Sequence, residues 1–206
     1  MERQAVEVVP DEAMVADWGQ GLEELIRRMA PHFVRIDALN RAWSFLLGLL
    51  SAVTRKNGWQ LSEEAGETTP YGFQHLLGQA KWDEDGVRDV VREYAVEALA
   101  ADWTVGVIDE SGFPKKGTHS VGVQRQYCGR LGKIENCQVG VFLGYATAKG
   151  AALIARALYL PEDWAADADR RAKAGVPQAV TFQTKPQLAV AYSPPNWSPI
   201  LLETDH

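Results

Sequence analysis

The first hundred residues carry hydrophobic side chains with the period of an α-helix. Between residues 39 and 53, large apolar residues recur at spacings of three and four, which places them on one helix face. These residues are Leu39, Trp43, Leu46, Leu50 and Val53. Comparable stretches predict further helices over residues 11–29, 61–65, 73–79 and 83–101. The pattern therefore predicts a helical N-terminal domain, residues 1–102. Asn57-Gly58 is expected to close its second helix, because both residues tolerate a left-handed conformation.

The hydrophobic period changes to two at Trp103. Val105, Val107 and Asp109 fall on one face of an extended strand, and Ile108 and Glu110 fall on the other. The composition of residues 111–117 predicts a loop. Further strands are expected over residues 121–127 and 137–147, and a helix over residues 162–174. Residues 151–160 fit a helix or a strand, with a hairpin turn at Lys149-Gly150 before them. We expect a three-stranded antiparallel sheet within residues 103–160, with Asp109 at or near the end of its first strand.

Composition indicates a globular protein of one or two domains. The chain has 206 residues, of which 46% are hydrophobic and 23% charged. Its longest apolar run, residues 43–53, is much shorter than the roughly 20 residues of a membrane span. The first residues lack the basic start and apolar core of a secretory signal. Two cysteines with no flanking histidines fit neither a disulfide framework nor a zinc site. We therefore expect a cytoplasmic protein without membrane contact.

Charge is distributed unevenly along the chain. The formal net charge is −6, yet residues 113–149 contain six lysines and arginines and a single acidic residue. The candidate DNA-contacting residues in this stretch are Lys115, Lys116, Arg125, Arg130 and Lys133. A local basic stretch can hold a phosphate backbone even in an acidic protein, although a solvated surface gives the same pattern.

Asp109 is the candidate for chemistry. It follows apolar residues on its own strand face, where a carboxylate is costly unless it is hydrogen-bonded or binds a cation. A strand-end aspartate with satisfied hydrogen bonds is the alternative. Glu110 points to the opposite face by strand alternation, so the two carboxylates do not form a chelating pair.

Several ordered motifs resemble the DDE-superfamily transposases of bacterial insertion sequences. They are RKNGWQL at 55–61, VIDESGFPKKG at 107–117, VGVQRQY at 121–127, IENCQVGVF at 134–142 and FQTKP at 182–186. The resemblance implies an α+β fold, in which the helical domain is followed by an RNase H-like catalytic domain whose first part is residues 103–190. It also implies that Asp109 is the first of three catalytic, metal-binding carboxylates. In the complete family these hold two Mg²⁺ or Mn²⁺ ions, which activate the attacking oxygen and stabilise the leaving one.

The chain departs from the family pattern after residue 186. The second aspartate is expected on a strand after the helix that begins near Pro186, and the glutamate later still. Residues 191–206 instead form a Pro-rich segment, expected to be disordered, and its Glu203 and Asp205 do not match the motif. We therefore expect an incomplete RNase H-like core, a truncated transposase that does not hold the metal pair alone.

Three functional hypotheses follow. The first is a catalytically incomplete transposase that acts on the DNA ends of an insertion sequence, with a second copy or a full-length transposase as partner. The second is a non-catalytic regulator that binds DNA or a transposase. The third is an unrelated enzyme in which Asp109 acts with His119 or Cys128; no accompanying nucleophile motif favours it.

Overall fold

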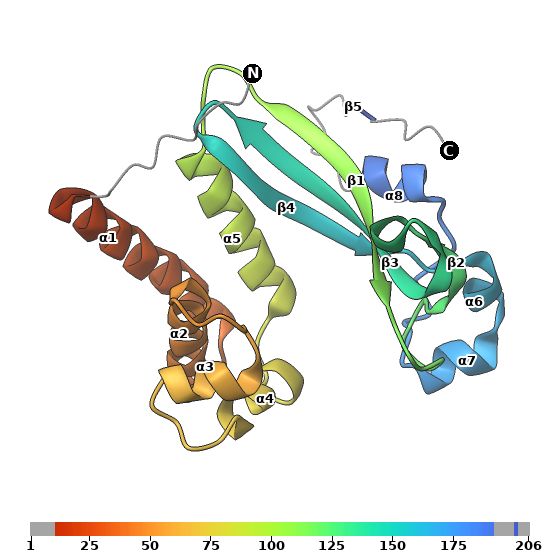
Figure 1. Ribbon diagram of the computed structural model, residues 1–206, viewed down its shortest axis with the longest axis horizontal. Helices are drawn as coiled ribbons and strands as arrows, with labels where there is room; N and C mark the ends of the chain where they lie inside the picture. Colours follow the sequence, from red (N-terminus) through yellow and green to blue (C-terminus); the bar gives the residue numbers. More distant parts are fainter. Residues whose placement is uncertain (1–10, 192–199, 202–206) are drawn as a thin grey trace. The chain divides into compact units, whose positions relative to one another are not determined.

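The computed structural model describes residues 11–191 and the backbone of residues 200–201 (Figure 1). Within these residues, helices come first along the chain and an antiparallel sheet follows, which confirms the α+β class. Contacts between residues divide the chain into two compact units, Met1–Val91 and Arg92–His206. Each unit is described by itself. Of the expected Pro-rich tail, residues 192–199 and 202–206 lie outside the described residues.

The first unit is helical. Its helices are α1 (Glu12–Met29), α2 (Ile36–Leu50), α3 (Gly58–Glu64), α4 (Tyr71–Gly78) and the start of α5 (Glu84–Ala98), with a short 3-10 helix, η1 (Ala30–His32), after α1. Asp11 caps α1, since its side chain accepts a hydrogen bond from the Met14 N–H at 2.8 Å. Leu61 and Phe73 are the most buried apolar side chains of this unit, at 1% exposure each. The predicted helices are all present, with shifted ends.

Asn57 does not close α2, contrary to the expectation from its sequence. The helix ends at Leu50, and Asn57 has an extended backbone with φ −119°. Its side-chain oxygen accepts hydrogen bonds from the N–H groups of Trp59 and Gln60, each at 3.1 Å. Asparagine satisfies free N–H groups at a helix start as readily as it adopts a left-handed turn, and here the start of α3 uses it.

The second unit contains a five-stranded sheet, and four of its strands lie within residues 103–160, where three were expected. The strands are β1 (Val105–Pro114), β2 (Gln124–Cys128), β3 (Lys133–Thr147), β4 (Gly150–Leu158) and β5 (Ile200–Leu201). The long strand β3 pairs antiparallel with β1, β2 and β4, while β5 pairs parallel with β1. The ambiguous segment after the confirmed β3–β4 hairpin is a strand, because pairing with β3 outweighs the helix propensity of its alanines.

Two other boundaries differ from the sequence-based expectation. Strand β1 continues to Pro114 through the residues expected to form a loop, and the whole of it pairs with β3. The expected helix over 162–174 is two helices, α6 (Glu162–Ala166) and α7 (Ala168–Lys173). They are separated at Asp167, whose side chain caps α7 by accepting from the Arg170 N–H at 2.9 Å.

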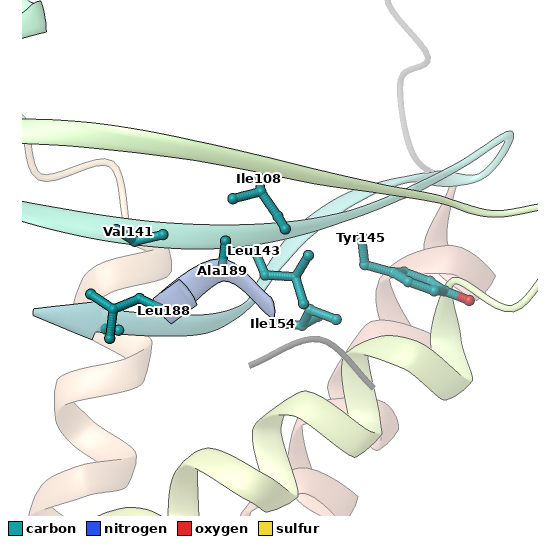
Figure 2. Packing of buried hydrophobic residues seen from close by; sticks show 8 residues of the cluster. Ile108, Val141, Leu143, Tyr145, Ile154, Leu188 and Ala189 are labelled. Atoms are coloured by element: carbon teal, nitrogen blue, oxygen red, sulfur yellow. The ribbon is translucent and has the colours of Figure 1, made fainter. Parts of the chain in front are cut away.

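One face of the sheet is buried, and we call it the Ile108 face. Every second residue of β3 on this face has at most 6% exposure: Cys137, Val139, Val141, Leu143 and Tyr145. Helix α8 (Lys185–Ala191) covers the face with Leu188 and Ala189. Figure 2 shows these two residues beside Ile108, Val141 and Leu143.

Candidate functional site

Asp109 lies in the middle of the ten-residue strand β1 rather than near its end. Its side chain is exposed, because the buried face of β1 is the one that carries Ile108. The expectation that Asp109 shares a costly apolar face is therefore wrong: the carboxylate keeps its solvation. One carboxylate oxygen accepts a hydrogen bond from the Glu110 N–H at 2.8 Å. The open face gives Asp109 access to solutes on that side of the sheet.

Glu110 lies on the opposite face of β1, as strand alternation predicts. Its carboxylate forms an ion pair with Lys185 at the start of α8, at 2.6 Å. The Lys185 ammonium group also lies over the ring of Tyr159, 5.5 Å from the centroid. Burial, with smaller contributions from Glu162 and Glu110, raises the pKa of Tyr159 above its usual value. Glu110 therefore takes part in anchoring α8 and is not a second ligand beside Asp109.

On its own face of the sheet, Asp109 has aromatic residues, a glycine and an arginine in its surroundings. The strand register aligns Asp109 with Phe142 of β3 and Phe142 with Arg156 of β4, so the three residues form one row across the sheet. Phe142 packs edge-on against Phe113, with ring centroids 6.2 Å apart. Its ring also covers Gly140, where an added Cβ would lie 2.8 Å away. We call this open side of the sheet the Asp109 face.

The described residues offer few ligands for a pair of metal ions near Asp109. Hard divalent cations bind several oxygen ligands, and the family's chemistry uses three carboxylates. Among residues 11–191, no three His, Cys, Asp or Glu side chains are grouped so that they could hold a metal ion. The described part of the chain thus supplies Asp109 as one possible ligand and does not fit the metal pair by itself.

The five basic residues predicted for DNA contact are all exposed, yet they do not share one face. Arg125 is aligned with Asn136 across the β2–β3 ladder. The Asn136 side-chain amide donates hydrogen bonds to the carbonyls of Lys115 at 2.7 Å and Gly117 at 3.0 Å. Asn136 therefore holds the loop with Lys115 and Lys116 next to Arg125. Sequence reasoning missed this role, because nothing in a lone asparagine indicates a partner some twenty positions away.

The other two basic residues are placed differently. Arg130 lies in the short 3-10 helix η2 (Gly129–Leu131) that joins β2 to β3. Lys133 lies on the opposite face of the ladder from Arg125, and its ammonium group pairs with the Glu135 carboxylate at 3.2 Å. The pKa of Glu135 is held below its usual value by the Asn136 N–H first, and then by Lys133 and Arg125.

The connection between β1 and β2 is anchored by two residues that the sequence analysis did not single out. The indole N–H of Trp164, in α6, donates to the Val123 carbonyl at 2.8 Å. The Arg170 guanidinium lies 3.7 Å from the Trp164 ring centroid and donates to the Thr118 and Val123 carbonyls at 3.0 and 3.1 Å. These contacts fix α6 and α7 beside the connection that carries Lys115 and Lys116 (Figure 1).

The third hypothesis needs Asp109 close to His119 or Cys128, and the structure does not bring these residues together as a catalytic group. Cys128 is fully buried and packs against Gly112 on the Ile108 face, away from the Asp109 carboxylate. Burial, followed by the neighbouring Cys128 thiol, raises the pKa of Cys137 to about 11. His119 is exposed in the β1–β2 connection. Both cysteines are 0% exposed and pack with Val139, so they are part of the core.

Comparison with known proteins identifies the class. Residues 28–195 match the DDE superfamily endonucleases, and the chain belongs to this family. Over 103 residues it is 33% identical to the probable transposase for insertion sequence element IS701 of Microchaete diplosiphon. The aligned part covers 48% of this chain and 27% of that transposase. No solved structure matches the chain significantly. Within its described part, no helix is long and apolar enough to cross a membrane.

Proposed function

We propose that this chain takes part in DNA transposition of an insertion sequence and carries the first portion of a transposase catalytic core. In this proposal residues 1–102 form the N-terminal helical domain, and residues 103–190 begin an RNase H-like domain with Asp109 as its first carboxylate. Support comes from the family match, which includes β1 to β4. The parallel strand β5 also supports it, since β5 lies beside Val107 and Ile108, where a later strand would bring its residues next to Asp109.

The position of Asp109 is the observation that carries the proposal. An exposed carboxylate in the middle of a central strand is open to a large substrate. The neighbouring carboxylate of Glu110 forms an ion pair with Lys185, as expected for a carboxylate with a structural role. The exposed carboxylate of Asp109 supplies oxygen atoms of the kind that bind a hard cation.

We further propose that the described residues do not cut DNA without additional carboxylates. DDE superfamily endonucleases generally use divalent metal ions, and Asp109 alone does not provide the ligands for a pair of them. The chain would then act on insertion-sequence ends together with a second copy or with a full-length transposase.

Cleavage of a plasmid that carries the ends of a related insertion sequence tests these proposals. We expect the purified chain to bind the DNA and to leave it uncut in either Mg²⁺ or Mn²⁺. Metal-dependent cleavage that Asp109→Asn abolishes would show that the chain is catalytically complete. Cleavage that survives Asp109→Asn in a preparation free of other nucleases would refute the role of Asp109.

A regulatory role is the second candidate, and the lack of a metal-binding group of carboxylates among residues 11–191 favours it. A chain that binds the same DNA ends without cutting them competes with an active transposase. Adding the chain to a full-length transposase from the same family should then lower strand transfer. Asp109→Asn should inhibit equally well if the role is regulatory, because competition for DNA does not use the carboxylate. A chain that leaves strand transfer unchanged would exclude this role.

A further inference from the structure

The strand β2 and the first five residues of β3 form a two-stranded ribbon joined by η2. Partners across an antiparallel ladder point to the same side. The pairs Arg125 with Asn136 and Tyr127 with Ile134 therefore share one face of the ribbon. Lys133 and Glu135 lie on its other face. The ribbon thus separates two of the basic residues that the sequence presents as equivalent.

This ribbon face continues the Asp109 face of the sheet. Ile134, Asn136 and Phe142 are separated by even numbers of residues along β3, and Phe142 is aligned with Asp109. Lys115 extends β1 toward the ribbon, since its N–H donates to the Asn136 carbonyl at 2.9 Å. Lys115 follows Asp109 by six positions of extended chain, which corresponds to a distance of about 20 Å. One continuous face therefore leads from the candidate carboxylate to the ribbon.

The ribbon face combines positive charge with exposed apolar side chains. Tyr127 is 42% exposed and Ile134 is 59% exposed, while the cations are Arg125 and the neighbouring Lys115–Lys116 pair. The chain as a whole has a net charge of −6, so this surface is opposite in sign to the rest of the molecule. Its charge is complementary to a polyanion. A two-stranded ribbon also has the width that the major groove of duplex DNA, about 12 Å across, admits.

We propose that this ribbon face grips duplex DNA about six nucleotides from the phosphate that lies at Asp109. The spacing follows from the ~20 Å between Asp109 and Lys115 and the 3.4 Å rise per nucleotide of duplex DNA. Arg125, Lys115 and Lys116 hold phosphates, and Tyr127 and Ile134 pack against the sugars and bases of the groove. The inference rests on the proposed function and adds to it the surface that positions the DNA.

Fluorescence anisotropy of the full chain with a labelled 30-base-pair duplex tests the ribbon at several salt concentrations. Arg125→Ala should weaken binding about three- to tenfold and reduce the slope of log affinity against log salt by about one. Tyr127→Ala should weaken binding to a similar degree. Lys133→Ala removes the same charge from the opposite face of the same ribbon, and Tyr71→Ala removes an exposed tyrosine from the other unit. Both controls should bind within about twofold of the original chain.

Each outcome decides a different part of the reasoning. Equal losses in Arg125→Ala and Lys133→Ala would overturn the inference, because total charge and not the ribbon face would then set affinity. Unchanged binding by the ribbon variants would overturn it too, while leaving the proposed function intact. A chain that binds no DNA would refute the proposed function itself. Arg125→Gln, with circular dichroism, replaces Arg125→Ala if the latter unfolds. A change in oligomeric state without a change in DNA affinity would make the ribbon an interface between copies and refute DNA binding there.

Discussion

Replacing Trp164 tests whether the fold depends on the anchor beneath the β1–β2 connection. The Trp164 side chain is 0% exposed and packs with Val123 and Leu160, which are 1% and 5% exposed. Truncating a fully buried tryptophan to alanine costs about 3–5 kcal/mol through lost burial and the cavity that remains. The Val123 carbonyl keeps the Arg170 hydrogen bond, so losing the indole donor adds only about 1 kcal/mol. We expect Trp164→Ala to lower the free energy of unfolding by about 5 kcal/mol.

Trp164→Phe separates packing from hydrogen bonding at this position. Phenylalanine keeps most of the apolar contact and a ring face for the Arg170 guanidinium, but it lacks the indole N–H that reaches Val123. The expected cost is about 1–2 kcal/mol, from one net hydrogen bond and the smaller ring. In this variant, the β1–β2 connection should keep only the hydrogen bonds that Arg170 donates to the Thr118 and Val123 carbonyls.

Urea unfolding at 25 °C, followed by far-ultraviolet circular dichroism, measures both effects. Trp103→Ala is the matched control, because Trp103 belongs to the same unit and is 60% exposed. Its cost should stay within about 0.5 kcal/mol, as for other surface substitutions. The reasoning is refuted if Trp164→Ala costs no more than Trp103→Ala. It also fails if Trp164→Phe costs as much as Trp164→Ala, because packing would then contribute nothing.

Three further predictions concern β1 and β3. Asp109→Asn should change the free energy of unfolding by less than about 0.5 kcal/mol, because the side chain is exposed; a larger loss in urea titration would indicate a structural role. Gly112→Ala should cost about 1–3 kcal/mol, since the new methyl group would lie 2.6 Å from the Cys128 sulfur, and Cys128→Ala in the same chain should recover part of this loss. Raising the pH from about 9 to about 11 should destabilise the fold by up to about 2–3 kcal/mol, because the unfolded Cys137 thiol ionises first while burial keeps the folded one protonated. Cys137→Ala should flatten that part of the pH–stability curve, and an unchanged slope would contradict the assignment.

The sequence predicted the helices and strands with strong periodicity and failed where both faces of an element are apolar. Helix α1 and strand β3 have one clear hydrophobic period each, and their predicted ranges agree with the structure to within a few residues. In β1, Val105 and Val107 are as apolar as Ile108, so alternation alone does not reveal which face is covered. Helix α8 packs on the Ile108 face, and this tertiary contact decides the exposure of Asp109.

The sequence suggests which residues could form the candidate site, but it does not show which of them lie on the same face of the sheet. The sequence alone does not distinguish Arg125 from Lys133, because both are basic residues of the same stretch. Their faces depend on the register of β2 against β3, in which a shift by one residue would exchange the two sides. The role of Asn136 depends on the same register. Sequence reasoning could therefore name the basic residues but could not select those that share a face with Asp109.

The packing around Asp109 restricts where further carboxylates could join it. On the β3 side, Asp109 is aligned with Phe142, whose ring lies over Gly140. The other edge of β1 is paired with β5 at Val107 and Ile108, immediately before Asp109 along the strand. The two ions of such a site lie about 3.5–4 Å apart. If Asp109 is the first carboxylate, the β5 edge and the open face are therefore two places from which its partners can reach it. The apolar side chains that remain exposed on β4, Leu153 at 70% and Leu158 at 46%, mark the opposite border of that face.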